Sequence, residues 1–317
     1  MSSINSEWLR QPMSKMERTL RLPYLITSAT KLLLTRTIPI WATIGLFGWF
    51  LTQSIFVSVV MGFLLTLAWE MFSLLGWYEK RTLPQHLSKL DSIKSSFEKL
   101  ETYSTSQLKC QIEETTKKSA WSIINILYLA LPSWGWEIIF LTLYPFLVSD
   151  KQIPYQNHLV GFGNKSTEAD QCLWDTAQEK DPTIQNKLLE NYLDIYGSRT
   201  EDLDLALPTL RERPKAITSL LVLYKRIPSP KFALELAKNK RDKSLKHVLK
   251  HLRIPKGIFL GLLKIVRKNV SLREDRRYYE FQADYYLRQM LLRLAKLTNI
   301  SSENIFNMSW DEVKKCS

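Results

Sequence analysis

A run of 33 residues without a formal charge, from Thr37 to Trp69, constrains the fold of this chain more than any other feature. The apolar character continues to Tyr78, with Glu70 as its one interruption. A membrane-spanning helix needs about 20 apolar residues, so this length suits two closely joined helices. The sequence therefore predicts a transmembrane or membrane-associated hairpin over residues 37–78. A helical hairpin buried inside protein is the alternative.

Basic residues flank the hairpin on both sides. Lys31 and Arg36 precede it, and Lys80 and Arg81 follow it. Because positively charged flanks stay on the cytoplasmic side, both ends of the hairpin are expected in the cytoplasm. We therefore expect a membrane location, with the other parts of the chain facing the cytoplasm.

The rest of the chain has helical patterns. Apolar residues recur every three or four positions from Leu87 to Leu100, and Ser104 and Gln107 have the spacing of a capping box that opens the next helix. A second apolar stretch, residues 121–148, contains two prolines and a glutamate, which favours burial in protein over a second membrane hairpin. No segment alternates with period two, so the expected fold class is mostly α, a membrane-associated helical hairpin followed by a helical bundle-like domain.

Four parts follow from these patterns. They are a polar N-terminal segment (1–36), the hydrophobic hairpin (37–78), a helical segment with the second apolar stretch (79–150) and a basic helical domain (151–317).

The positive charge is concentrated in the last third of the chain. The net charge is +13, and residues 201–317 alone carry 25 Lys and Arg against 13 Asp and Glu. Such a charge predicts either an anionic or phosphate-bearing partner or a solvated basic face. The segment Lys238–Lys268 has 11 basic residues and one acid but no aromatic ladder, so a nucleic-acid partner is not expected.

Residues with metal-binding or phosphate-binding potential are few. The three cysteines are far apart, which excludes a disulfide framework and a cysteine zinc site and indicates a reducing compartment. His247 and His251 are four residues apart, but Val248 stands where an HExxH motif has Glu and no third ligand is apparent, so no metal site and no cofactor are expected. The segment GFGNKS (161–166) could cradle a phosphate, but a turn is favoured.

Two S-x-x-E sequences near the end predict helix starts. Ser271 and Glu274 precede a continuous apolar stripe that runs from Tyr279 to Leu297. Ser309 and Glu312 form the second pair, with only five residues after it. Because so short a helix is not stable alone, this element is expected to be completed by another polypeptide or by a longer chain.

Two gapped motifs carry a resemblance to a known family. The first opens with Leu272, Arg273, Glu274 and Asp275 and closes with Ile305, Phe306, Met308, Ser309 and Glu312. The second, YLDIYGSRTEDLDLALPTLRERP, includes Tyr196, Gly197, Arg199, Asp204, Pro208, Glu212 and Pro214. Residues 95–317 resemble the helical middle region of phosphoenolpyruvate-synthase-like (PEP-utilising) enzymes, including rifampicin phosphotransferases, which precedes their swivelling phosphohistidine domain. Ser198 replaces the usual His of this family, and Thr209-Leu210 replace Arg-Trp.

The resemblance implies that separate domains carry out the steps of phosphoryl transfer. In this family an ATP-grasp domain phosphorylates a His on a mobile domain, which carries the phosphoryl group to an acceptor. The present sequence contains neither a GxGxxG nor a GxxxxGK[ST] loop, nor the surroundings of the carrier His, so no catalytic residue is expected. The family-motif positions expected to have a structural or acceptor-binding role are Tyr196, Gly197, Arg199, Glu212, Arg273, Glu274 and Asp275.

The function that follows is a non-catalytic, membrane-tethered middle module of a split or truncated phosphotransfer system. It would hold the acceptor and dock a separate His-carrier domain, with an ATP-grasp polypeptide as a further partner. The alternative is a structural membrane scaffold or interaction protein with no role in phosphotransfer.

Overall fold

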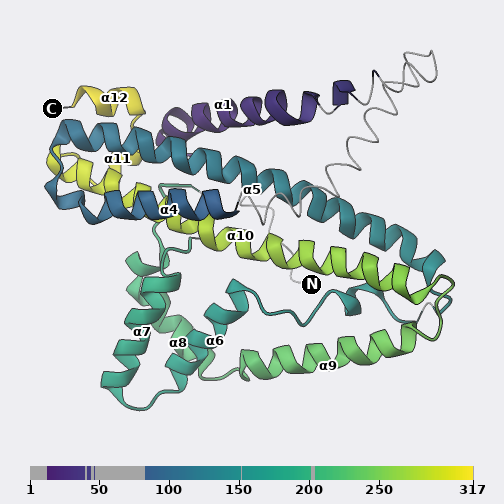
Figure 1. Cartoon of the computed structure of the whole chain (residues 1–317). Coiled ribbons are helices and arrows are strands. Elements are labelled where there is room, and N and C mark those ends of the chain that lie inside the picture. Colours follow the sequence, from purple (N-terminus) through teal and green to yellow (C-terminus); the bar gives the residue numbers. More distant parts are fainter. Residues whose placement is uncertain are drawn as a thin grey trace.

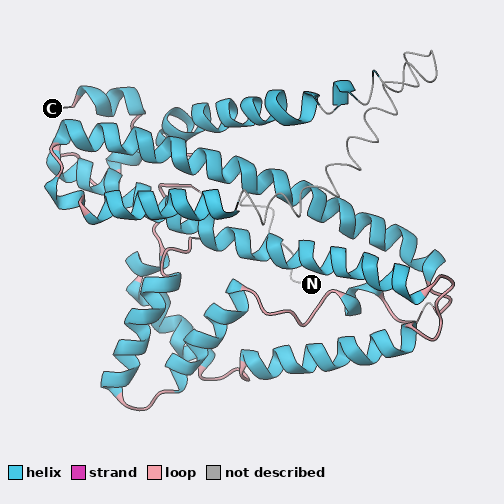
Figure 2. Cartoon of the chain, in the orientation of Figure 1, coloured by secondary structure: helices cyan, strands magenta, loops and turns pink. Residues whose placement is uncertain are grey.

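The computed structural model describes residues 13–39, 41–43, 46, 83–150, 152–200 and 204–316. Helices make up nearly all the secondary structure in these ranges (Figure 2). They contain no strand, and one isolated antiparallel bridge pairs Val148 with Leu252. The prediction of a mostly α fold is therefore confirmed.

The elements, with η for short π or 3-10 helices, follow in this order: η2 (Glu17–Arg21), α1 (Leu22–Leu32), η3 (Leu33–Thr37), α4 (Leu83–Glu98), η5 (Leu100–Thr102), α5 (Thr105–Leu147), η6 (Tyr155–His158), α6 (Lys165–Gln178), α7 (Pro182–Tyr196), η7 (Leu210–Glu212), α8 (Pro214–Tyr224), α9 (Pro230–Val248), α10 (Lys256–Leu297), α11 (Asn304–Asn307) and α12 (Trp310–Lys315).

Two long helices, α5 with 43 residues and α10 with 42, form the axis of the molecule (Figure 1). Both are roughly 60 Å long at 1.5 Å per residue. Leu108 near the start of α5 shares a core with Leu291 near the end of α10, whereas Phe140 near the end of α5 shares another core with Phe259 near the start of α10. The two helices therefore run antiparallel and have a separate core at each end.

The first core lies where α5 begins and α10 ends. Its buried side chains come from parts of the chain that are distant in the sequence, including Met16, Leu20, Leu108, Ile112, Leu287, Leu291, Ile305, Trp310 and Val313. The N-terminal and C-terminal segments of the described chain are thus packed together on one end of the helix pair (Figure 1).

The short C-terminal helix α12 belongs to this core. Ser309 and Glu312 form the expected capping box, and Trp310 and Val313 are 4% and 0% exposed. The indole N–H of Trp310 also donates to Glu113 of α5 at 2.8 Å. The expectation that another polypeptide must complete this helix is therefore wrong, because its own chain supplies the packing that a short helix needs.

The second core lies at the opposite end and is rich in aromatic side chains. Trp136, Phe140 and Tyr144 of α5 are buried against residues of α9 and α10. These side chains belong to the second apolar stretch, 121–148, and their burial agrees with the prediction that the stretch packs inside protein.

A third, smaller core joins α6, α7 and α8, which lie together beside α10 (Figure 1). Its buried members include Leu173, Tyr192, Tyr196 and Ile217. Helix α9 then returns toward the start of α10, so that the segment from α6 to α9 spans the space alongside the long helix pair.

Capping sequences predict the start of α5 correctly and the start of α10 wrongly. The box of Ser104 and Gln107 is present at the start of α5, as predicted. Ser271, in contrast, lies in the middle of α10, which begins at Lys256 directly after Pro255. The predicted helix start at Ser271 is therefore wrong, because an S-x-x-E sequence does not interrupt a helix whose apolar face is continuous on both sides of it.

The structure also corrects the membrane prediction. None of the helices within the described ranges is sufficiently long and apolar to cross a membrane. The predicted transmembrane helices and the membrane location based on them are contradicted by this finding. Most of the predicted hairpin, 37–78, lies outside the described residues, and the division into four parts stays a prediction.

Candidate functional site

Tyr196 and Gly197, two of the residues expected from the family motif, form the end of α7. The ring of Tyr196 is 5.7 Å from that of Tyr278 of α10, measured between centroids, and its hydroxyl is 3.5 Å from a carboxylate oxygen of Glu168. The Gly197 N–H donates to the Leu193 carbonyl at 2.9 Å. A Cβ at position 197 would lie 2.3 Å from that oxygen. The close approach of the backbone therefore explains this glycine.

Arg199 and Asp275 converge on the start of α6. The Arg199 guanidinium lies 3.4 Å from both the Lys165 carbonyl and the Ser166 hydroxyl. The Asp275 carboxylate accepts from the Lys165 backbone N–H at 2.8 Å. A carboxylate is favourable at the positive end of a helix. Residues of the two sequence motifs, 76 positions apart, thus meet at one helix terminus.

The GFGNKS segment forms the irregular loop, the N-cap and the first two residues of α6. Asn164 caps the helix by accepting from the Thr167 N–H at 2.8 Å, and Asp275 takes the N–H of Lys165. Gly161 has φ 76°, and a Cβ there would lie 2.7 Å from the backbone of α9. Protein oxygens already accept from these N–H groups, so a phosphate cradle is not supported. The predicted turn is an irregular loop that ends in the N-cap of α6.

Glu212 joins the loop after α7 to α10. Its carboxylate accepts from the Arg288 guanidinium at 2.9 and 3.1 Å and from the Thr209 N–H at 2.7 Å. Burial raises the pKa of Glu212, but these two donors outweigh it and hold the pKa below its ordinary value. Arg288 also donates to the Leu205 carbonyl at 2.6 Å, so this one side chain joins both the middle and the last part of the loop to α10.

Arg273 and Glu274 lie within α10, beside Asp275, and not at a helix start. The described contacts of Tyr196, Gly197, Arg199, Glu212 and Asp275 are with other parts of the chain. Their observed role is to hold α6, α7 and α10 together. An acceptor-binding role for the seven motif positions stays a prediction.

The loop held in this way borders a cleft of about 380 Å³ between α4, the end of α7 and α10. This volume lies within the range of small-molecule sites, roughly 300–1,000 Å³. The cleft combines aromatic, cationic and acidic side chains, and its lining residues are Lys94, Phe97, Glu98, Leu193, Asp194, Ser198, Arg211, Gln282, Tyr285 and Tyr286.

Three aromatic rings form one side of the cleft. The Phe97 ring centroid is 5.0 Å from that of Tyr286 and 5.9 Å from that of Tyr285. Arg211 pairs with Asp194 and lies over the Tyr285 ring, 5.9 Å from its centroid. Burial raises the pKa of the Tyr286 hydroxyl, which stays neutral at physiological pH.

This arrangement is suited to binding. The aromatic faces can stack a planar ligand, while Lys94 and Arg211 can pair with an anionic group on it. Geometry therefore points to a ligand-holding cleft.

Sequence reasoning identified only part of this site. Ser198 stands at a departure from the family motif, whereas no sequence pattern predicts that Phe97, Arg211 and Tyr285 line a cleft. The predicted apolar stripe of α10 is correct where Ala283, Met290 and Leu294 are buried. The signal that could have indicated the cleft is Tyr285, which is adjacent to the stripe but not on it, and so leaves an aromatic face away from the core.

Comparison with known proteins supports the resemblance inferred from sequence. Residues 148–274 match the family model of the rifampicin phosphotransferase fourth domain. The match includes the motif from Tyr196 to Glu212 and thus the loop that borders the cleft, and it ends one residue before Asp275. No curated protein matches the chain significantly. This part of the chain is therefore similar to a helical region of the rifampicin phosphotransferases.

Proposed function

We propose that this chain is a non-catalytic helical module of a PEP-utilising phosphotransfer system. It holds the phosphoryl acceptor in the cleft between α4, α7 and α10, and it docks a separate phosphohistidine carrier that is charged by an ATP-grasp domain. The observation that carries this proposal is the match of residues 148–274 to the rifampicin phosphotransferase fourth domain.

The position of the cleft supports the acceptor role. Leu193, Asp194, Ser198 and Arg211 come from the matched segment. Phe97 and Tyr285 add aromatic surface from outside it. The matched segment therefore supplies polar groups to a site whose aromatic faces come from α4 and α10.

Helix α9 is the surface that we assign to the carrier domain. Phe232 and Leu236 lie one turn apart and are 65% and 62% exposed. Six Lys and Arg residues and two acids accompany them between residues 230 and 248. A phosphohistidine carries negative charge, so a basic surface with an apolar pair complements such a partner.

Co-purification from the cells that encode the chain tests the docking role. The untruncated chain is expected to retain a polypeptide with an ATP-grasp or phosphohistidine-carrier sequence, identified by mass spectrometry. Phe232→Asp with Leu236→Asp should abolish that retention. Ile184→Asp, at a 49% exposed apolar residue of α7, is the matched control and should retain it. Retention that survives the double substitution would exclude α9 as the docking surface.

Ligand titration tests the acceptor role separately. The name of the matched family gives rifampicin as the substrate of its phosphotransferases, so rifampicin is the first probe, with calorimetry as the readout. Tyr285→Ala should weaken binding about tenfold, because stacking on an aromatic ring contributes roughly 1 kcal/mol or more. Trp134→Ala, at a 48% exposed aromatic residue of α5, should bind as the unchanged chain does. Equal affinity for the Tyr285→Ala variant would contradict this site.

A scaffold or interaction protein with no phosphotransfer role is the second candidate. The exposed apolar pair on α9 favours it as much as it favours carrier docking. The identity of the partner distinguishes the two, because a scaffold would retain a protein with neither an ATP-grasp nor a phosphohistidine domain.

A further inference from the structure

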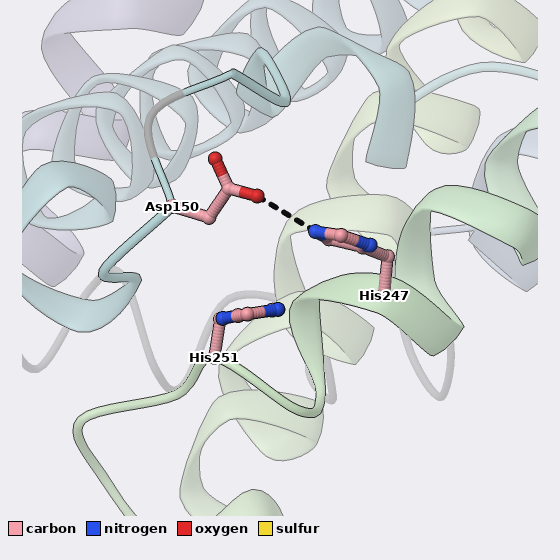
Figure 3. Close-up of side chains that lie close together, drawn as sticks. All are labelled: Asp150, His247 and His251. Atoms are coloured by element: carbon pink, nitrogen blue, oxygen red, sulfur yellow. Dashed lines mark hydrogen bonds and ion pairs between the residues drawn. The ribbon is translucent and has the colours of Figure 1, made fainter.

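Three potential metal ligands meet where α5 and α9 end (Figure 3). His247 lies in the last turn of α9, and His251 follows four residues later. Asp150 comes from the segment directly after α5, 97 residues before His247. One ligand atom from each of the three side chains lies within 4.8 Å of the others.

The side chains are already oriented toward one another. The two imidazole rings are stacked, with centroids 4.6 Å apart and an angle of 25° between their planes. The Nε2 atom of His247 is 2.6 Å from Oδ2 of Asp150. Around a tetrahedral zinc ion, with bonds near 2.1 Å, ligand atoms are about 3.4 Å apart. Small side-chain rotations therefore convert this cluster into a coordination geometry.

Hydrogen bonds hold the two segments together without help from the three candidate ligand side chains. The Ser149 N–H donates to the His251 carbonyl at 2.9 Å, and the Arg253 N–H donates to the Leu147 carbonyl at 2.9 Å. The Ser149 hydroxyl adds a third hydrogen bond to the His251 carbonyl at 2.8 Å. The Asp150 and His251 backbones are thus placed next to each other by the fold.

We propose that Asp150, His247 and His251 bind a zinc ion or a similar borderline divalent transition metal. Two imidazole nitrogens and one carboxylate oxygen are a donor set that such ions prefer, whereas Mg²⁺ and Ca²⁺ prefer oxygen donors alone. Three protein ligands leave the fourth tetrahedral position to water. His247 is about half exposed, so the ion can reach the site from solvent.

The Asp150 carboxylate supplies the negative charge that attracts a cation to this site. The backbone N–H of Gln152, and next the His247 ring, lower the pKa of Asp150 and keep it ionised. Lys246 and Lys250 flank the histidines and are exposed, so they repel a dication through screened interactions. The Asp150 carboxylate and the negative end of α9 offset that repulsion. Two neutral imidazoles without this carboxylate would bind the ion much more weakly.

Metal binding would join the ends of α5 and α9 next to the aromatic core. An ion that binds only the folded chain stabilises it by mass action. The site also lies wholly inside the segment 148–274 that matches the phosphotransferase fourth domain.

Calorimetric titration of the full-length, untagged and EDTA-dialysed chain with ZnCl₂ is the direct test. One ion per chain is expected, with a higher thermal midpoint in its presence. Asp150→Asn, His247→Gln and His251→Gln should each weaken binding by about tenfold or more and lose the thermal shift. Glu235→Gln, which removes an exposed carboxylate from the same helix α9, is the matched control and should bind normally.

Cobalt substitution identifies the ligands. Cys110 is exposed and could bind metal elsewhere, but a thiolate ligand would give a sulfur-to-cobalt charge-transfer band. The proposal predicts tetrahedral d–d bands without that band, unchanged in a Cys110→Ser variant. Circular dichroism of each variant confirms that it is folded.

Three outcomes would overturn the proposal. They are a chain that binds no zinc at micromolar concentrations, an Asp150→Asn variant with unchanged affinity, and a cobalt spectrum with thiolate ligation that disappears in Cys110→Ser.

Discussion

The two ends of the α5–α10 pair bury polar groups in opposite ways. At the end that holds both chain segments, Arg21 of η2 is buried between Glu17 and Asp284 and pairs with both carboxylates. At the other end, His158 is buried within the aromatic core, and its Nε2 lies 2.9 Å from the Tyr144 hydroxyl. One end therefore depends on a compensated set of charges and the other on aromatic packing around an uncharged ring.

Folding makes the buried carboxylates at one end easier to protonate and the buried histidine at the other end harder to protonate. Burial raises the pKa of Glu17 to about 7 and that of Asp284 to about 6, although Arg21 lowers both. Burial, and next Arg267, lower the pKa of His158 to about 4. The folded state therefore favours protons on the carboxylates at the first end and disfavours a proton on the histidine at the second. The difference shows that one helix pair can be stabilised by two mechanisms that respond differently to substitution and to pH.

Phe140→Ala should have the largest effect on the aromatic end. Phe140 is fully buried and packs on Phe259, with ring centroids 6.1 Å apart. Its removal leaves a cavity and should lower the free energy of unfolding by about 4 kcal/mol, measured by urea denaturation. Phe146→Ala, at a 69% exposed residue of the same helix, is the matched control and should change it little. Equal losses in both variants would mean that this core is not packed as described.

Arg21→Met should have the next largest effect, at the charged end. It leaves the Glu17 and Asp284 carboxylates without their shared partner, at a cost of about 3 kcal/mol near pH 8. The loss should be smaller near pH 5.5, because the carboxylates can take up protons there. Lys15→Met removes an equal charge from an exposed pair with Glu312 and should have little effect. A loss independent of pH would contradict the buried network.

The His158→Gln variant measures how much His158 contributes to the pH dependence of stability at the aromatic end. The pKa of His158 is about 4 in the folded chain and about 6.5 in the unfolded chain. Its contribution is therefore fully present above pH 6.5 and is lost as the pH falls toward 4. The free energy of unfolding of the unchanged chain should fall by about 1–2 kcal/mol more than that of the variant between pH 7 and pH 5. Parallel pH profiles would show that His158 is not buried as a neutral ring.

Ser309→Ala tests how firmly the C-terminal helix is held, with the smallest expected effect. The Ser309 hydroxyl accepts from the Glu312 N–H at 3.3 Å, and losing an N-cap costs about 1 kcal/mol. Ser219→Ala is the control, because Ser219 is inside α8 and donates to the Lys215 carbonyl. Hydrogen exchange should increase in α12 alone. No change there would indicate that packing of Trp310, without the cap, holds the helix.

The fold was predictable where local rules decide it. The capping boxes at Ser104 and Ser309 form as expected, and the apolar spacing of α10 gives the buried face. Ser271 shows the limit of such rules, since a capping sequence inside a longer amphipathic pattern stays helical. For the stretch 121–148, Pro132, Glu137 and Pro145 favoured burial in protein, and Trp136 and Phe140 are buried as that interpretation requires.

The candidate sites were predictable only in part, because they combine distant segments. Arg199 and Asp275 were identified by motif, but their meeting point at α6 depends on the tertiary fold. Asp150 was invisible as a third ligand for His247 and His251, because 97 residues separate it from the first of them. The spacing of residues in the sequence can identify metal ligands that are close together in the chain. It cannot identify a carboxylate that a distant segment supplies.

The central claim is that this chain binds and positions, while a separate donor performs the phosphoryl chemistry. The most direct test measures ATP consumption and phosphoryl transfer to rifampicin with the purified chain alone and with its co-purified partner. The account predicts no turnover by the chain alone, and turnover with the partner that decreases when Tyr285 is replaced by Ala. Phosphoryl transfer by the isolated chain would contradict it.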